Sequence, residues 1–214
     1  LGLEWMETDL RLTADGIVVL SHDEDLRRTA NDPRTVREVM WAELADLDSG
    51  DGRGFVRLDD ALHAHPTMRF NIDLKDSGVV QAALQTVRDA DALDRVRFAS
   101  FSARRLAVLR RQEPRATTSL GVGDVLGLML RSEAAVPLPQ TRWGWTRGRV
   151  DAVQVPESYL GVPVVTRRFV ASAHTADLEV HVWTVDDPER MCQLAELNVD
   201  AIMTDVPTLA LQTL

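Results

Sequence analysis

The chain has 214 residues, and its 33 acidic residues outnumber its 24 lysines and arginines, which gives a formal net charge of −9. This acidic balance argues against nucleic acid or an anionic membrane surface as the main partner. Hydrophobic residues make up 45% of the chain, as in globular proteins, and they form no apolar run long enough for stable membrane insertion.

The only cysteine, Cys192, bears on the cellular compartment and on metal chemistry. One thiol excludes an internal disulfide and leaves the chain without a cysteine-based metal motif. We therefore expect a cytoplasmic protein, although the abrupt start at Leu1 leaves secretion open. The position of Cys192 between Met191 and Leu194 predicts a small residue of the core.

Short apolar runs alternate with longer amphipathic segments along the whole chain. A further short strand over 17–20 follows the Asp15-Gly16 turn, and we expect it to form a hairpin with the first strand or to extend that strand. The main strand candidates, which are rich in β-branched residues or alternate strictly, are 3–10, 68–74, 96–101, 117–122, 152–155, 180–185 and 201–203.

Apolar residues recur at a helical period of about 3.6 between many of these strands. This period predicts helices over 79–90, 103–111, 167–176 and 188–197, the last with a proline in its first turn. The stretch 123–149 has the least regular pattern, and its Trp143-Gly144-Trp145 sequence is typical of a loop.

Strands that alternate with helices imply an α/β fold whose parallel sheet is covered by helices. The alternation has no break, so it predicts a single domain over 1–214, built as a (β/α)8 TIM barrel. A doubly wound open sheet is the main alternative, but no glycine-rich phosphate loop follows a strand candidate. Seven candidates are found instead of eight, so we expect the first barrel strand to lie upstream of Leu1.

Glu7 and Asp9 alternate along the first strand candidate and therefore point to the same face. On an arbitrary strand such a pair is usually no more than a solvated surface. At the carboxyl end of a barrel strand it indicates a site for a hard divalent cation, because two adjacent carboxylates repel each other. His22 follows the short strand 17–20 directly, within reach of the carboxylates, as a general acid or base would need to be.

Asp73 and Lys75 share one face at the end of the strand candidate 68–74. They could form a purely structural ion pair. In the functional interpretation, Asp73 is a third metal ligand and Lys75 is a cation for an anionic substrate.

These residues belong to an ordered set of motifs. The set comprises an E-x-D strand at Glu7, T-x-D-G at Thr13, H-D at His22, L-x-R-T at Leu26, N-I-D-L-K at Asn71, W-T-V at Trp183 and a final V-D-x-I-x-T-D-x-P that ends at Pro207. Together they resemble the glycerophosphodiester phosphodiesterase family over residues 3–207.

The resemblance implies a metal-dependent TIM barrel that hydrolyses glycerophosphodiesters to glycerol 3-phosphate and an alcohol. By the same resemblance, Glu7, Asp9 and Asp73 would hold Mg²⁺ or Ca²⁺, and His22 would be one of two catalytic histidines. The implied substrate is a small molecule. By the same resemblance, Lys75 would contact its phosphate and Trp183 would line the pocket.

Three departures from the family pattern stand out. Asp73 replaces the usual Glu, and Asn198 replaces a common Gly at a helix end where left-handed geometry is tolerated. The opening His-Arg-Gly segment, which carries the other catalytic histidine, is expected upstream of Leu1. The remaining histidines do not match its context, and we expect them to be structural or exposed: His63, His65, His174 and His181.

Two other functions stay open at this stage. A barrel domain without catalysis would keep the fold and lose the chemistry. A phospholipase D-like enzyme that acts on lysophospholipids would share the barrel and the metal site, although the single cysteine is unlike the disulfide-bonded members of that group. Trp143 and Trp145 could then form a lipid-contacting rim, or they could simply pack within their loop. The oligomeric state is not indicated by the sequence.

Overall fold

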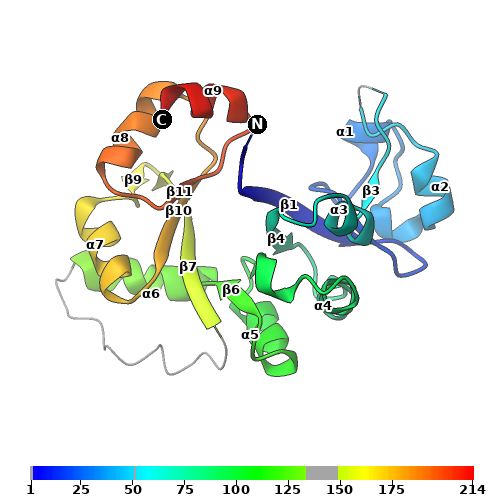
Figure 1. Cartoon of the computed structure of the whole chain (residues 1–214), viewed down its shortest axis with the longest axis horizontal. Helices are drawn as coiled ribbons and strands as arrows, with labels where there is room; N and C mark the ends of the chain where they lie inside the picture. The colour runs from blue at the N-terminus through cyan, green and yellow to red at the C-terminus, as the bar shows by residue number, and fades with distance from the viewer. Residues whose placement is uncertain (1, 51, 134–148) are drawn as a thin grey trace.

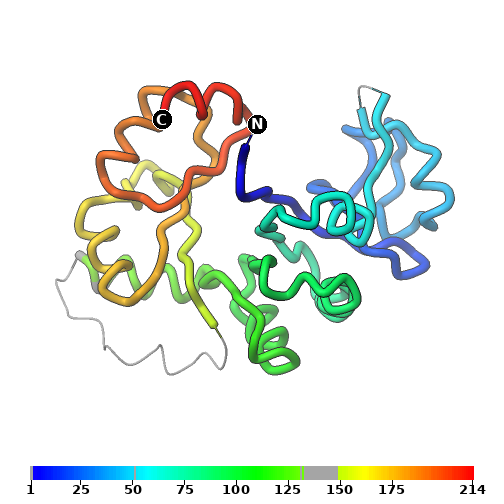
Figure 2. Tube along the Cα trace, in the orientation of Figure 1, coloured from blue at the N-terminus to red at the C-terminus, as the bar shows by residue number. Residues whose placement is uncertain are grey.

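The computed structural model describes residues 2–50, 52–133 and 149–214. Its main sheet has nine strands that curve around a common centre, with helices on the outside (Figure 1). The trace in Figure 2 passes once around this centre from the N-terminus to the C-terminus. The α/β barrel architecture expected from the sequence is therefore confirmed.

Seven strands of this sheet run parallel, and their order in the sheet is their order in the chain. These strands are β1 (Trp5–Leu12), β4 (Arg69–Leu74), β5 (Val96–Ala99), β6 (Thr117–Ser119), β7 (Arg149–Pro156), β10 (Glu179–Trp183) and β11 (Ala201–Ile202). Each of them overlaps one of the seven predicted strands. Among the described residues, β1 and β11 are not paired with each other.

The remaining strands are short and antiparallel. β2 (Val18–Leu20) pairs with the end of β1, as the predicted hairpin requires, and β3 (Val56–Arg57) pairs with β2. A separate hairpin contains β8 (Ser158–Tyr159) and β9 (Val162–Pro163).

The helices α4 (Val79–Asp89), α5 (Ala103–Gln112), α7 (Arg167–Thr175) and α8 (Pro188–Glu196) match the four predicted helices. Three of them begin at a side-chain cap, where a Ser, Thr or Asp oxygen accepts a hydrogen bond from the backbone N–H three residues later. The other helices are α1 (Arg27–Ala30), α2 (Trp41–Ala45), α3 (Leu58–Ala64), α6 (Val122–Glu133), α9 (Pro207–Thr213) and the 3-10 turns η1 (Val36–Glu38) and η2 (Leu93–Arg95).

Helix α6 lies at the start of the stretch 123–149, which had the least regular sequence pattern. Gly123 and Gly127 weaken its intrinsic helix propensity by about 1 kcal/mol each relative to Ala. Burial of Leu128, with Val125 and Met129 packed against the same core, stabilises the helix despite these glycines. Trp143 and Trp145 lie outside the described residues.

The prediction that Cys192 is a core residue is wrong. Cys192 is exposed, whereas Met191 and Leu194 are fully buried. Successive helix positions are rotated by about 100°, so the face that buries Met191 and Leu194 turns Cys192 to solvent. The expectation for Asn198 is confirmed, because its φ of 61° is left-handed where the chain leaves α8.

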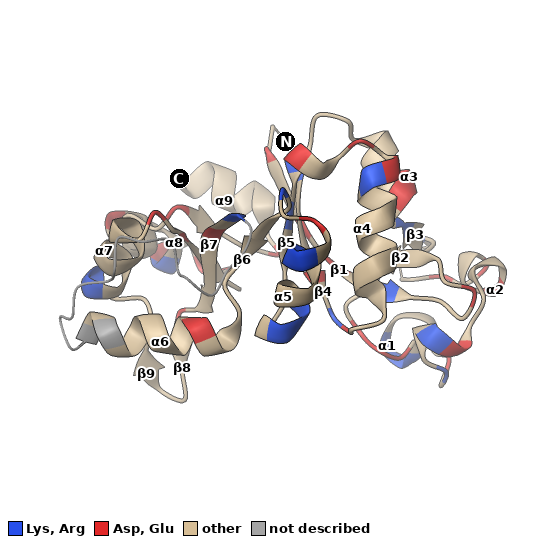
Figure 3. Cartoon of the chain, turned by 90° about the horizontal axis from the view of Figure 1, so that it is seen from below, with Lys and Arg blue, Asp and Glu red and all other residues tan. Residues whose placement is uncertain are grey.

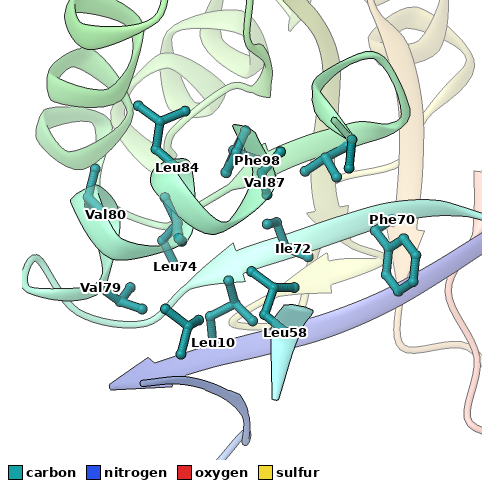
Figure 4. Close-up of a cluster of buried hydrophobic side chains, with 14 of the residues drawn as sticks. Leu10, Leu58, Phe70, Ile72, Leu74, Val79, Val80, Leu84, Val87 and Phe98 are labelled. Atoms are coloured by element: carbon teal, nitrogen blue, oxygen red, sulfur yellow. The ribbon is translucent and has the colours of Figure 1, made fainter. Parts of the chain in front are cut away.

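Alternate residues of β4 face opposite sides of the sheet, and this alternation determines where the polar side chains lie. Phe70, Ile72 and Leu74 pack against α3 and α4 in the first hydrophobic cluster (Figure 4). Asn71 and Asp73 therefore point to the concave side. A second cluster, which includes Val153, Val180, Phe169 and Met191, covers β7 and β10 in the same way.

No helix within the described ranges is long and apolar enough to cross a membrane.

We expect Ile72→Ala to lower the free energy of unfolding by about 2–5 kcal/mol, because it removes a fully buried side chain from the first cluster and leaves a cavity. Urea denaturation followed by circular dichroism measures this change. Leu211→Ala is the control, since Leu211 is 48% exposed and its truncation should change stability by less than about 0.5 kcal/mol. Equal effects of the two substitutions would contradict the assignment of the core.

Candidate active site

The parallel register of β1 and β4 brings three acidic residues to the concave side of the sheet. Asp9 pairs with Asp73 across the two strands, and Glu7 pairs with Asn71 two residues earlier. Asp9 and Asp73 lie toward the carboxyl ends of their strands, which is the end where barrel active sites are built. The structure thus places the three acidic residues expected to hold a metal on neighbouring strands, although their side chains are not grouped as a metal site.

Lys75 lies between the two aspartates. Its Nζ atom is 2.8 Å from Oδ1 of Asp9 and 2.9 Å from Oδ2 of Asp73. Burial alone would lower the pKa of Lys75, but its contacts with Asp9 and Asp73 outweigh burial and raise that pKa, so the amine is protonated. The structural interpretation of Lys75, as a member of an ion pair, therefore describes its contacts in this structure.

The negative charge at this position exceeds what one lysine can offset. Oδ1 of Asp73 is buried and has no hydrogen-bond partner among the residues that the structure describes. Burial raises the pKa of Asp73, and it also raises the pKa of Glu7 to about 7, with a further contribution from the charges of Asp9 and Asp73. The Glu7 residue as a whole is nevertheless exposed, so solvent offsets part of this desolvation. Both pKa values rise mainly because burial disfavours the charged carboxylate, and the charge of Lys75 offsets only part of this effect.

These residues fit a hard divalent cation by their chemistry. All three side chains offer carboxylate oxygens, which such ions prefer, and Asp73 has a buried oxygen without a partner. Among the described residues, no three His, Cys, Asp or Glu side chains are already grouped closely enough to hold a metal ion. In this structure the ammonium group of Lys75 supplies the positive charge between Asp9 and Asp73.

His22 lies in the loop that follows β2, close to the end of β1. The backbone N–H of Ser21 donates to the carbonyl of Asp9 over 2.9 Å, which fixes the start of this loop beside the acidic residues. Nδ1 of His22 is 2.8 Å from Oδ1 of Asp23, and Oδ2 of Asp23 accepts a hydrogen bond from Nε of Arg28. The His22 side chain is 69% exposed, so its other ring nitrogen is accessible to a substrate.

Asp23 is held in its ionised form. Its hydrogen bond from Arg28, and then that from His22, lower the pKa of Asp23. An ionised Asp23 accepts a hydrogen bond from Nδ1–H of His22, which orients the ring and leaves Nε2 for proton transfer.

A cavity of about 330 Å³ opens beside Asp73 and Lys75. Its lining consists of Asp73, Leu74, Lys75, Phe101, Ser102 and Arg105, from the ends of β4 and β5 and the start of α5. Trp183, at the end of β10, is half-buried, and its ring meets that of Phe101 edge-on at 5.7 Å between ring centroids. Trp183 is thus connected to the cavity through Phe101.

Phe101 and Arg105 were not selected from the sequence. Phe101 closed an apolar strand candidate, and Arg105 was one of several arginines on a helix that had the pattern of a solvated surface. Their position after β5 was a usable signal, since residues that follow barrel strands surround the active site.

The concave side below the acidic residues is filled by a second polar network. Arg97, which is 2% exposed, donates hydrogen bonds to Asp151 and Glu179, and its guanidinium stacks 4.5 Å from the centre of the Trp5 ring. His181 is buried next to Arg97, with Nε2 3.0 Å from Glu179. Burial, followed by the charge of Arg97, lowers the pKa of His181.

The remaining three histidines, His63, His65 and His174, are exposed. Together with the buried His181, these three residues confirm the expectation that the four histidines are structural or exposed.

The fold and this arrangement agree with comparisons to known proteins. A profile of the glycerophosphoryl diester phosphodiesterase family matches residues 1–209. The chain belongs to this family. It catalyses the hydrolysis of glycerophosphodiesters to glycerol 3-phosphate and an alcohol, and members of the family typically use a divalent metal ion.

Individual relatives support this assignment. The Mycobacterium tuberculosis protein called probable glycerophosphodiester phosphodiesterase 2 is 36% identical over 96% of this phosphodiesterase and 77% of its own length. The structure of a glycerophosphoryl diester phosphodiesterase domain from the same organism superimposes with a TM-score of 0.80 at 18% identity, over 99% of this chain and 88% of that one. The structure of an Oleispira antarctica phosphodiesterase in complex with sn-glycerol 3-phosphate superimposes with a TM-score of 0.77 at 19% identity. The match covers 99% of this chain and 85% of that one. At these identities the two structures establish the fold.

We expect the raised pKa of Glu7 to make the metal-free phosphodiesterase less stable as the pH rises. The folded protein holds a proton on Glu7 up to about pH 7, whereas the unfolded chain releases it near 4.5. The contribution to stability is therefore present below 4.5 and is lost as the pH rises to about 7.

Glu7→Gln cannot ionise, so its free energy of unfolding should rise relative to wild type between about pH 5 and pH 8 in the presence of a chelator. Urea unfolding at both pH values gives the comparison, and excess divalent cation should reverse the difference at the higher pH. A constant difference between wild type and variant at both pH values would contradict the shift.

Proposed function

We propose that Glu7, Asp9 and Asp73 hold the divalent cation of the reaction and that His22 transfers a proton to or from the reacting oxygens. The observation that carries this proposal is the register of β1 and β4, which places Glu7, Asp9 and Asp73 on neighbouring strands. One buried oxygen of Asp73 has no partner among the described residues, and the loop that carries His22 is hydrogen-bonded to Asp9. Lys75 and Trp183 complete the set as substrate-binding residues.

Oxygen ligands favour Mg²⁺ or Ca²⁺ over softer metals. When bound, the ion acts as a Lewis acid that stabilises negative charge on the phosphate. The shorter side chain of Asp73, in place of the usual Glu, reduces its reach by one methylene group. We expect this to favour an ion that keeps some of its water.

Lys75 binds the substrate phosphate. Its Nζ atom is fixed by Asp9 and Asp73 at the wall of the cavity, so an anion entering there meets a charged donor that is already positioned. The negative charges of the three acidic residues would otherwise repel a phosphodiester. Lys75 therefore has two roles, as a structural ion-pair partner and as the cation that receives the substrate.

His22 moves the proton. Because Asp23 accepts from Nδ1, the Nε2 atom is the ring nitrogen that takes a proton from the nucleophile or gives one to the leaving alkoxide. Asp23 in turn is oriented by Arg28. The chain Arg28–Asp23–His22 thus holds the ring in one orientation without filling the space where the substrate would lie.

We expect His22→Ala to lower kcat for glycerol 3-phosphate release by about 10²–10⁴-fold and to leave folding intact, since the side chain is largely exposed. A coupled glycerol 3-phosphate assay on the full-length protein measures the rate with glycerophosphoglycerol as substrate. A parallel arm with lysophosphatidylcholine is measured by the release of choline.

His65→Ala is the matched control, because His65 is exposed and lies outside the cavity. Activity of His22→Ala within a few-fold of wild type would place the acid–base group elsewhere. Activity on lysophosphatidylcholine alone would favour the phospholipase D-like alternative.

A second prediction concerns metal binding. Asp73→Asn should weaken the binding of Mg²⁺ or Ca²⁺ at least about tenfold in calorimetric titrations with the metal alone, because it removes one of three charged ligands. Asp60→Asn, on the exposed side of α3, should leave the affinity unchanged. Unchanged affinity in Asp73→Asn would remove Asp73 from the ligand set, whatever the effect on turnover. The ion that binds more tightly identifies the preferred metal.

A further inference from the structure

The backbone carbonyl of Leu74, the last residue of β4, accepts two side-chain hydrogen bonds. Oγ of Ser100 donates to it over 2.9 Å, and Nη1 of Arg105 donates to it over 2.5 Å. Ser100 is buried directly after β5, and Arg105 lies in the first turn of α5, a helix that carries four arginines (Figure 3). A buried hydroxyl group and a guanidinium therefore converge on one peptide group.

This carbonyl lies where the pairing of β4 with β5 has already ended. The paired register of the two strands ends with Asp73 and Ala99, one residue before Leu74, which is itself fully buried. Buried carbonyl groups need hydrogen-bond donors, and a charged donor binds them more strongly than a neutral one. Ser100 and Arg105 therefore supply from side chains the hydrogen bonds that the strand pair supplies further back.

The same peptide group is held on its other side by β1. The backbone N–H of Lys75 donates to the carbonyl of Leu10 over 3.4 Å. The peptide between Leu74 and Lys75 is thus hydrogen-bonded at its oxygen and at its nitrogen, which fixes where the lysine side chain leaves the backbone. Because this side chain is a flexible four-carbon stem, the position of its ammonium group depends on that fixed starting point.

The other contacts of Arg105 are also made within the protein. Its Nη1 atom donates a second hydrogen bond, to Oγ of Ser100 over 2.9 Å, so both N–H groups of this nitrogen are used. Its Nε atom is buried and has no hydrogen-bond partner among the described residues. Neither nitrogen is therefore available to a substrate in the adjacent cavity. The positive charge of Arg105 is opposed by Asp73, which lines the same cavity.

We propose that Arg105 positions Lys75 for the substrate phosphate by holding the backbone carbonyl that precedes Lys75, and that Ser100 assists it. Arg105 is a positioning residue in this arrangement, because it acts through the backbone of Lys75 and not on the substrate. The inference rests on the proposed function, in which Lys75 binds the phosphate.

The first test measures kcat and KM for glycerophosphoglycerol with the full-length protein and a saturating divalent cation. Arg105→Met should raise KM about tenfold and change kcat by less than about threefold, because a displaced Lys75 weakens the binding of phosphate before the chemical step. Calorimetric titration with glycerol 3-phosphate should show the same loss of affinity. Arg104→Met, at the exposed neighbouring position of α5, is the matched control and should leave both constants unchanged.

Ser100→Ala removes one hydrogen bond from the same carbonyl and changes no charge. We expect it to raise KM about threefold, as the loss of a neutral hydrogen bond would, again with little effect on kcat. If Arg105 acted only through the effect of its charge on Asp73, Ser100→Ala would keep the wild-type KM. Thermal unfolding of each variant shows whether the protein is still folded.

A double-mutant cycle tests whether Arg105 acts through Lys75. Lys75→Gln should raise KM by itself, and Arg105→Met added to it should change KM by less than about twofold more, because the group that is positioned has been removed. A further rise as large as the one in the wild-type background would overturn the inference, since Arg105 would then act on the substrate or on Asp73 directly.

The outcomes separate this inference from the proposed function. A wild-type KM in Arg105→Met or in Ser100→Ala refutes the positioning role and leaves the phosphate contact of Lys75 in place. A wild-type KM in Lys75→Gln refutes that phosphate contact, and the positioning role with it, while the metal and histidine assignments are untouched. If Lys75→Gln or Arg105→Met does not fold, the KM of Ser100→Ala decides.

Discussion

Two aspartates that face each other across β1 and β4 impose the main constraint on this structure. Asp9 and Asp73 are brought side by side by the strand register, so their negative charges must be offset where they stand. Lys75 supplies part of the compensation, while burial and the charges of Asp9 and Asp73 still raise the pKa of Glu7. A site that accumulates negative charge in this way is stabilised by a bound cation or a bound proton, and members of the family typically use a divalent cation.

The hydrophobic cluster outside the sheet keeps this register in place. Phe70, Ile72 and Leu74 are fully buried against helices, so a slip of β4 by one residue would turn them into the concave side and bury the aspartate face against α4. Stability and chemistry are therefore determined by the same strand. The apolar residues select the register, and the polar residues between them depend on it for their positions.

Much of the fold could be predicted because buried parallel strands are continuous in apolar residues and their helices have caps and regular periods. Helix α6 was harder to predict from the sequence, because Gly123 and Gly127 lower its helix propensity. Its stability comes instead from the burial of Leu128 against elements that are distant in the chain. Glu7, Asp9 and Asp73 could be selected as a group from spacing and motif order. Arg105 could not, because its difference from Arg104 is one of direction around a helix, and only the three-dimensional structure shows which of the two reaches the cavity.

Arg97 has a consequence for how the chain reaches this fold. The two hydrophobic clusters belong to opposite halves of the barrel, and Arg97, on β5 of the first half, bonds to Asp151 and Glu179, which lie 54 and 82 positions further along the chain. Contacts of such long sequence separation form late, because the intervening loop must first be closed at a cost in entropy. Each half can collapse around its own cluster first, so the docking of the two halves through Arg97 is the slow step that the topology favours.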